Sequence, residues 1–368
     1  MSIPGPVSDP SDTTRRDTLA TRLFESTLGA FDLLVVHLGL DLGLYEALAE
    51  HGALSPPELA ARAGIDRRYA REWLEHQAVG GILDVDDHAA GPDERRYTLP
   101  EGHREVLLDP DSLSAGAALP KFVLSAGRTW PALLEAYRSG GGVDWAHYPG
   151  LIEAQDLANR PVFARLLTES WLPAIPDVHA RLLSEPPARV ADLACGTGWS
   201  SIAIARGYPL ARVDGLDIDR TSIEQARRNA DGLGVDDRLR FHHIDAGDHQ
   251  LDGRYDVVTI FEAVHDLARP VEVLTAVRLL LARGGTAIVV DERVAETFTA
   301  PGDEIERLMY SYSVLFCLAN GLADQPSIGT GTVMRPETFR RYATEAGFGS
   351  VEILPIEHDT FRLYRLHA

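Results

Sequence analysis

The chain has 368 residues, 45% hydrophobic and 24% charged, a composition typical of a globular protein of about two domains. Its formal net charge of −20 repels phosphate backbones, which makes nucleic acid a poor partner. Its two cysteines, Cys195 and Cys317, are too few for a disulfide framework and favour a cytoplasmic location.

The N-terminal third predicts a small, mostly helical domain. Residues 1–16 are polar and contain prolines, which indicates a disordered tail and not a signal peptide. Two helices are predicted over 17–48, and the charged residues inside their apolar stretch argue against a membrane span. Ser55 and Glu58 form a capping-box pattern, and Asp66 caps the next helix. The runs 82–85 and 96–99 then predict a two-stranded wing, so residues 17–110 are predicted to be a winged-helix domain.

Residues 111–188 predict a helical linker. Its aromatic residues Trp145, Tyr148 and Trp171 are candidates for the wall of a substrate pocket. Packing in the core is the alternative for each of them. We therefore expect the linker to contribute one wall of a pocket.

The stretch 189–219 predicts a strand, a glycine loop, a helix and a second strand that ends at Asp217. Glycines let a backbone approach a ligand, and a carboxylate after the second strand can accept ribose hydroxyls. A dinucleotide site would favour a third glycine where Ser201 stands. The pattern therefore favours an adenosine ligand other than a dinucleotide.

In these motifs the chain resembles the class I S-adenosylmethionine-dependent methyltransferases. Their first motif, an acidic residue followed by x-x-x-G-x-G, matches Asp192 to Gly198, and acidic residues follow at the ends of later strands. The resemblance implies an α/β fold, a Rossmann-like doubly wound sheet of the seven-stranded methyltransferase type, with S-adenosyl-L-methionine as cofactor. The residues expected to bind it are Asp192, Gly196, Gly198, Asp217, Ile218, Asp245, Ala246 and Glu262.

The catalytic domain is predicted over 189–368, with an insertion at 296–333 that interrupts the alternation of strands and helices. The insertion carries Tyr310 and Phe316, which suggests a helical lid that excludes water and contacts the substrate. The last helix is predicted over 336–346, and 351–354 with 361–366 should close the sheet as a hairpin.

A general base is needed for most methyl acceptors, and His265-Asp266 follows the fourth strand of the domain. The chain here resembles secondary-metabolite O-methyltransferases, whose H-D-W motif places the base at His265, although Leu267 replaces the tryptophan. Glu292 could support the imidazolium, and Glu262 could hold the cofactor's amino group or orient the histidine. The alternative for His265 is a solvent-bonded residue at a helix start.

No metal is expected, because neighbouring strand residues such as His242 and His243 point to opposite faces of a sheet. The acceptor is expected to be a small aromatic or polyketide-like molecule, methylated on oxygen or carbon. One alternative function is a regulator that senses S-adenosylmethionine, and another is a non-methylating reaction that uses the bound sulfonium.

The winged-helix module raises the question of DNA binding. Between His37 and Pro110 it carries 15 acidic residues against 7 arginines, a net charge of −8, which DNA would repel. In the methyltransferases that the chain resembles, this module forms a dimer. We therefore expect a homodimer joined through the N-terminal domain, with no nucleic acid and no membrane as partner.

Overall fold

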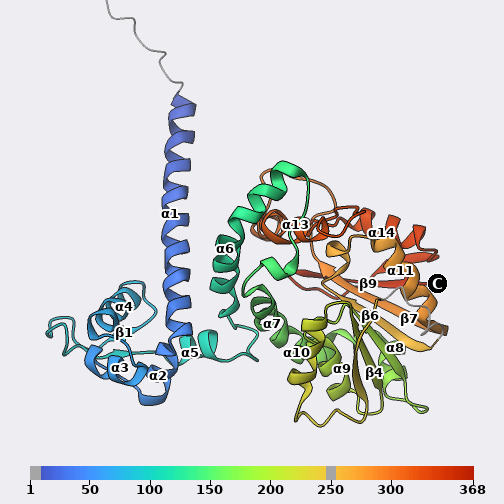
Figure 1. Cartoon of the computed structure of the whole chain (residues 1–368), viewed down its shortest axis with the longest axis horizontal. Coiled ribbons are helices and arrows are strands. Elements are labelled where there is room, and N and C mark those ends of the chain that lie inside the picture. The colour runs from blue at the N-terminus through green and yellow to red at the C-terminus, as the bar shows by residue number, and fades with distance from the viewer. Residues whose placement is uncertain (1–9, 246–253) are drawn as a thin grey trace, which may run out of the picture. The chain divides into compact units, whose positions relative to one another are not determined.

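The computed structural model describes residues 10–245 and 254–368 (Figure 1). The chain divides into two compact units, Met1–Leu124 and Ser125–Ala368, and each is described by itself.

The first unit is a helical domain with a small wing. It contains α1 (Pro10–Asp41), α2 (Leu44–His51), α3 (Pro56–Ala63), α4 (Arg67–Val79), β1 (Asp84–Val85), β2 (Tyr97–Thr98) and α5 (Glu101–Leu108). The two strands pair antiparallel, as the predicted wing requires. The capping box is confirmed because Ser55 N donates to Glu58 Oε2 at 2.8 Å, and Asp66 accepts from Arg68 N at 2.8 Å.

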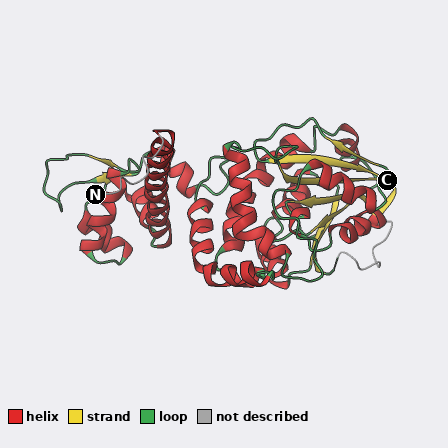
Figure 2. Ribbon diagram, turned by 90° about the horizontal axis from the view of Figure 1, so that it is seen from above, coloured by secondary structure: helices red, strands yellow, loops and turns green. Residues whose placement is uncertain are grey.

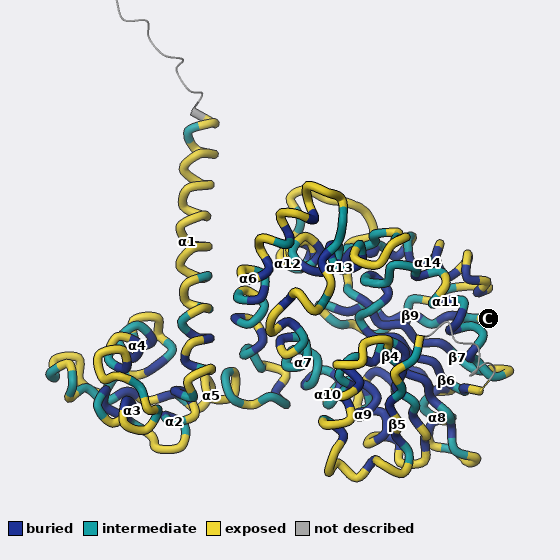
Figure 3. The backbone as a smooth tube through the Cα atoms, viewed as in Figure 1, coloured by how far each residue is buried: buried dark blue, intermediate teal, exposed yellow. Residues whose placement is uncertain are grey.

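Helix α1 differs from the prediction at its start. It begins at Pro10, so residues 10–16 are helical and the predicted tail is wrong there, whereas residues 1–9 lie outside the described residues. Figure 3 shows α1 as largely exposed. By length and composition alone Ser11–Asp41 could cross a membrane, which is weak evidence for a helix beside the N-terminus. Its exposed apolar residues are Leu19, Leu23, Phe24, Leu28, Phe31, Leu34 and Leu38.

The second unit is built on a seven-stranded sheet in the order β5-β4-β3-β6-β7-β9-β8. Strands β3 to β7 are parallel, and β9 runs antiparallel to both β7 and β8, so the predicted hairpin and fold class are confirmed. The strands are β3 (Arg189–Leu193), β4 (Arg212–Asp217), β5 (Leu239–His243), β6 (Tyr255–Phe261), β7 (Leu281–Glu292), β8 (Ser350–Ile353) and β9 (Phe361–His367).

Helices cover both faces of this sheet (Figure 2). One core contains residues of α8 (Pro176–Leu182), α9 (Trp199–Gly207) and α10 (Arg220–Ala230), and the other contains residues of α11 (Pro270–Leu280) and α14 (Pro336–Glu345). Alternating strand residues feed the two cores: Val257 belongs to the first and Val258 to the second. Burial on both faces explains why the strands are continuous apolar runs.

Further helices precede and interrupt the sheet. Helix α6 (Ala118–Ser139), α7 (Leu151–Val162) and a π-helical segment, η2 (Phe163–Trp171), come before it. The predicted lid is helical, with α12 (Glu304–Tyr312), a second π-helical segment, η5 (Ser313–Cys317), and α13 (Leu318–Gly321).

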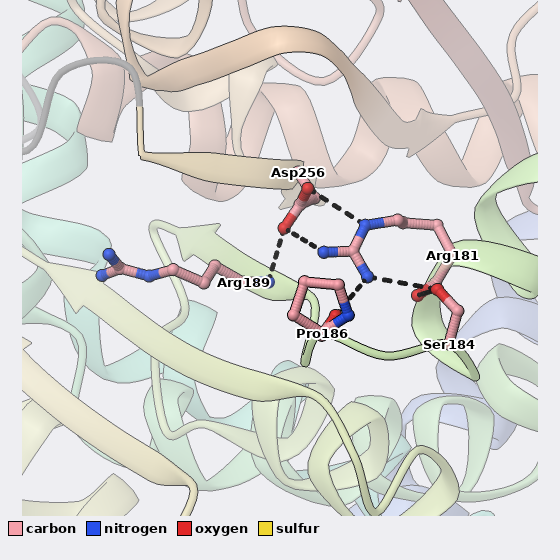
Figure 4. Close-up of polar contacts among 5 residues, drawn as sticks. All are labelled: Arg181, Ser184, Pro186, Arg189 and Asp256. Carbon is pink, nitrogen blue, oxygen red and sulfur yellow. Dashed lines mark hydrogen bonds and ion pairs between the residues drawn. The ribbon is translucent and has the colours of Figure 1, made fainter.

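A cluster of hydrogen bonds holds the segment before β3 against the start of β6 (Figure 4). Arg181 of α8 donates to both carboxylate oxygens of Asp256 on β6, at 3.1 and 3.0 Å, and to the carbonyl of Pro186 at 2.8 Å. Asp256 also accepts from the backbone N–H of Arg189, where β3 begins. The cluster therefore ties α8 to β3 and β6.

From β3 the chain first adds β4 and β5 on one side of the sheet and then continues with β6 and β7 on the other side. The strand order therefore reverses beside β3. In doubly wound sheets, ligands bind beside the carboxyl ends of the strands at such a point. The segments after β3, β4, β6 and β7 are therefore the place to search for a site.

Candidate active site

The loop after β3 is held in a conformation that favours glycine. Gly196 has a φ of 53° and Gly198 a φ of 85°, and Ala194 adopts a φ of 53° without being glycine. A Cβ on Gly198 would lie 2.6 Å from the ring of Phe241, so a side chain does not fit there. Helix α9 starts directly after this loop and directs its free N–H groups to the same edge.

Asp217 ends β4 beside this loop. Its Oδ2 accepts from Gly196 N at 2.8 Å, and its Oδ1 accepts from Asp219 N at 2.8 Å. Burial raises the pKa of Asp217, although both backbone donors oppose that shift. Each carboxylate oxygen keeps a second lone pair, so the carboxylate can still accept ribose hydroxyls. Gly196, Gly198 and Asp217 are thus brought together, and their geometry fits an adenosine cofactor.

Asp192 lies deeper than these residues, with an exposed fraction of 0%. Its Oδ2 accepts from the hydroxyls of Ser200 and Ser201, both at 2.6 Å, and its Oδ1 accepts from Thr259 at 2.8 Å. The carboxylate therefore ties the start of α9 to β3 and β6. In this structure its partners are protein hydroxyls, and a contact with the cofactor stays a prediction.

The remaining predicted cofactor residues lie around this loop. Ile218 is 69% exposed beside Asp217, and Asp245 is exposed just after β5. Ala246 lies outside the described residues. Their roles stay predictions.

Helix α7 adds contacts to the loop that sequence reasoning missed. Asp156 Oδ1 accepts from Thr197 Oγ1 and from Trp199 Nε1, both at 2.5 Å. One helical turn later, the guanidinium of Arg160 lies 4.6 Å from the centre of the Trp199 ring. These contacts hold α7 against the start of α9 and fix the shape of the glycine loop.

His265 lies at the same edge of the sheet, in a short 3-10 turn after β6, and is only 2% exposed. Its Nδ1 lies 2.8 Å from both Asp291 Oδ1 and Glu292 Oε2, and its Nε2 lies 3.3 Å from Asp266 Oδ1. One N–H can point to only one acceptor, and the hydrogen bond goes to Asp291. Glu262, three residues before the histidine, completes a group of four acids that we call the carboxylate cluster: Glu262, Asp266, Asp291 and Glu292.

The charges in this cluster are strongly coupled. Burial alone would lower the pKa of His265, but Asp266, Glu292 and Asp291 raise it well above its ordinary value. Burial raises the pKa of Asp291, yet His265 more than offsets this, and the net shift is downward. Burial raises the pKa of Glu262 to about 8, raises that of Glu292 well above its usual range, and raises that of Asp266. Asp291 and His265 therefore form the ion pair of the cluster.

Aromatic side chains of the linker and the lid meet beside this cluster. The ring centres of Tyr148 and Phe316 are 5.6 Å apart, those of Trp145 and Tyr148 are 6.0 Å apart, and those of Tyr312 and Phe316 are 6.3 Å apart. Burial raises the pKa of Tyr148 well above its ordinary value, and the neighbouring Cys317 and Asp266 contribute to the same shift. Trp145, Tyr148, Tyr312 and Phe316 therefore form one group of aromatic rings, and their contact with a substrate stays a prediction.

Two other predicted substrate residues point elsewhere. Trp171 packs in the core against Phe361 and His358, which favours the alternative interpretation as a core residue. The hydroxyl of Tyr310 lies 3.3 Å from Arg335, which also pairs with Glu306 at 2.8 Å. Tyr310 is therefore part of the contact that fastens α12 near the start of α14.

Two triads, His265–Asp291–Glu292 and His265–Asp266–Cys317, have side-chain N, O or S atoms within 4.8 Å of one another. In both, the ring nitrogens of His265 face carboxylates at ion-pair distance. We interpret the group as acid–base machinery, and the expected absence of a metal stays a prediction. The pair His242 and His243 bind different partners, Asp214 and the carbonyl of Ile218.

The sheet order, the glycine loop and the carboxylate after β4 together define a class I methyltransferase fold. Comparisons with known proteins agree. Residues 184–335 match the family model described as a methyltransferase domain, and residues 30–108 match the Rv2258c-like winged HTH domain.

Among solved structures, the mitomycin 7-O-methyltransferase MmcR is similar with a TM-score of 0.71 and 19% identity, over 97% of this chain and 100% of that one. The human N-acetylserotonin methyltransferase in complex with SAM gives a TM-score of 0.70 and 17% identity, over 99% of each chain. At these identities the likeness concerns the fold.

Among curated relatives, the ubiquinone biosynthesis O-methyltransferase of Psychrobacter arcticus is 27% identical over 175 residues. That match covers 46% of this chain and 63% of the relative. The chain therefore carries an S-adenosylmethionine-dependent methyltransferase domain and an N-terminal winged-helix domain.

Proposed function

We propose that the protein transfers a methyl group from S-adenosylmethionine to an oxygen of a small aromatic molecule. The observation that carries the proposal is the position of His265. It lies at the sheet edge that holds the glycine loop, with Nδ1 fixed by Asp291 and aromatic rings of the linker and lid nearby. A buried, oriented imidazole beside a cofactor loop has the geometry of a general base.

The cofactor supplies an electrophilic methyl group on a sulfonium, and the chain's own residues supply the rest. Gly196, Gly198 and Asp217 would hold the adenosine. Nδ1–H donates to Asp291, which orients the ring. To act as the base, the ring must first lose the proton that its carboxylate neighbours stabilise on Nε2, and Nε2 can then accept the proton of the acceptor hydroxyl. The nearby carboxylates stabilise the imidazolium that forms. Oxygen is favoured over carbon because a phenol needs one proton removed at the position where the base stands.

The aromatic wall supports an aromatic acceptor, since flat rings pack against Tyr148, Tyr312 and Phe316. The exposed apolar residues of α1 support the expected homodimer, because a single soluble copy rarely leaves so long an apolar face in water. The cytoplasmic location is part of the same proposal.

The test begins with calorimetric titration of S-adenosylmethionine, S-adenosylhomocysteine and NAD. We expect micromolar binding of the first two and none of NAD. Acceptor screening should then compare phenols with indoles and enols. In His265→Ala, turnover should fall on the order of a hundredfold or more with cofactor affinity nearly unchanged.

The matched control is His88→Ala, which removes an exposed histidine of the first unit and should leave turnover at the wild-type level. Binding of NAD alone would overturn the cofactor assignment. Unchanged turnover in His265→Ala would overturn the base.

A further inference from the structure

The carboxylate cluster contains more carboxyl groups than its one cationic side chain, His265, can balance in charge. Four carboxyl groups, Glu262, Asp266, Asp291 and Glu292, surround His265, and each has a buried oxygen without a hydrogen bond among the described residues. Two of these oxygens, Asp266 Oδ1 and Glu292 Oε2, lie at ion-pair distance from the histidine ring, whereas Glu262 Oε1 and Asp291 Oδ2 do not. Asp291 is 1% exposed, and its free Oδ2 is one of these oxygens. Ionised carboxyls without partners are too costly to bury, so a group of this kind keeps protons until a cation arrives.

Glu262 is the member of the cluster with the weakest cationic support. Asp291 and Glu292 both lie 2.8 Å from Nδ1 of His265, and Asp266 lies 3.3 Å from Nε2. Glu262 is hydrogen-bonded by the neutral side chain of Asn159, and its Oε1 has no partner in the described ranges. One imidazolium cannot balance four carboxylates. A proton on Glu262 would remove the negative charge that the histidine balances least.

The location of Glu262 connects it to the cofactor. It follows β6 directly, and β6 pairs with β3, the strand that leads into the glycine loop. Glu262 has a φ of 51°, the counterpart of the φ of 53° at Ala194 after β3. If His265 is the base, the methyl donor would lie in line with the acceptor oxygen beside it, and its sulfonium would come close to this cluster.

We propose that Glu262 distinguishes the sulfonium cofactor from its uncharged thioether product, by keeping a proton in the free enzyme and releasing it when the positive charge binds. The O–H bond of the carboxylic acid breaks, its electron pair stays on the carboxylate, and the proton passes to solvent. After methyl transfer the sulfur is neutral, and the carboxylate takes a proton back. This inference rests on the proposed function.

The surrounding groups agree with this assignment. The groups that interact with Glu262 are Asn159 from α7, His265 and Asp266 from the turn after β6, Asp291 from β7 and Tyr312 from α12. Glu292 and Cys317 lie next to these groups, against His265 and Asp266. The pKa of Glu262 is raised to about 8, chiefly by burial; His265 opposes this shift, and Asp291 and Asp266 add to it. Burial also raises the pKa of Tyr312 and of Cys317 to about 12, so both stay neutral.

The sign of the pH dependence follows from linkage. A ligand that lowers a pKa releases protons, and its affinity rises with pH until the pKa of the free enzyme is reached. The affinity for S-adenosylmethionine, relative to S-adenosylhomocysteine, should therefore rise about tenfold between roughly pH 6.5 and 8. Taking the ratio removes most of the effect of the amino acid group that both molecules carry.

The experiment is calorimetry at about pH 7 in two buffers with different heats of ionisation, which counts the protons released on binding. S-adenosylmethionine should release between about half a proton and one proton more than S-adenosylhomocysteine. An analogue with a protonated amine in place of the sulfonium should behave like S-adenosylmethionine. Glu262→Gln should remove the excess release and its pH dependence, whereas Glu296→Gln, which changes an exposed carboxylate after β7, should keep both.

Equal proton counts for the two cofactors in the unmodified protein would overturn the proposal without any variant. A full excess release in Glu262→Gln, with S-adenosylhomocysteine still bound, would assign the proton to another group and would also overturn it. If neither molecule bound the unmodified protein, the proposed function itself would fail, and this inference with it.

Discussion

Two polar clusters lie at the same edge of the same sheet, and they differ in how their carboxylates are partnered. Asp192 is a single buried carboxylate with three hydroxyl donors. The carboxylate cluster packs four acids around one histidine and leaves oxygens without partners among the described residues. The first cluster joins α9, β3 and β6, whereas the second lies after β6 and at the end of β7, beside Cys317 of η5.

The difference separates a structural role from a chemical one. A fully bonded buried network stabilises one arrangement and has little reason to change its charge. In an incompletely bonded network the carboxyl groups can take up or release protons, and a bound cation is stabilised most strongly there. Substitution of Asp192 breaks the fully bonded network, and substitution of Asp217 or Asp156 disturbs the glycine loop.

The largest expected effect is on stability, in Asp192→Ala. This change leaves the hydroxyls of Ser200, Ser201 and Thr259 without their acceptor, and we expect a loss of about 3 kcal/mol in the free energy of unfolding. Urea unfolding followed by circular dichroism measures it. Asp192→Asn keeps one carbonyl acceptor and should lose about half as much. A loss below about 1 kcal/mol in the alanine variant would mean that the cost of burying the carboxylate cancels its hydrogen bonds.

A smaller effect is expected on cofactor affinity in Asp217→Ala. Loss of a charged acceptor for the ribose hydroxyls should weaken binding of S-adenosylmethionine by roughly 2–3 kcal/mol, measured by calorimetry. Asp217 also accepts from Gly196 N, so the variant disturbs the loop as well. Asp217→Asn keeps an acceptor for that N–H and separates loop shape from charge. Near-equal affinity in both variants would remove Asp217 from the cofactor site.

Sequence patterns predicted the parts of this site that depend on residues close together in the sequence. The glycine loop and Asp217 are near in sequence, and parallel strands bring the ends of β3 and β4 to one edge. The caps Ser55 and Asp66 depend on a few neighbouring residues.

What was missed depends on contacts across long stretches of sequence. Asp156 lies 41 residues before Thr197, and nothing in its own helix marks it as a partner of the loop. Glu292 was predicted to support His265, and it lies 2.8 Å from Nδ1, but the sequence did not show that its neighbour Asp291 accepts the hydrogen bond. The aromatic residues were predicted to line a pocket only because they are aromatic. The structure distinguishes Tyr148, which contacts Phe316, from Trp171, which belongs to the core. Helical periodicity gives the apolar face of a helix but not the element that covers it.

The smallest of these effects tests the missed residue. In Asp156→Ala the hydroxyl of Thr197 and the indole N–H of Trp199 lose a shared acceptor, so the glycine loop is held less firmly. We expect cofactor affinity to fall by about 1 kcal/mol, roughly fivefold, with little change in turnover at saturating cofactor. Trp199→Phe removes one of the two donors and keeps a ring for Arg160 to stack on, so its effect should be smaller. If Asp156→Ala instead lowered turnover and left affinity unchanged, α7 would act on the carboxylate cluster through Asn159 and Glu262 and not on the loop.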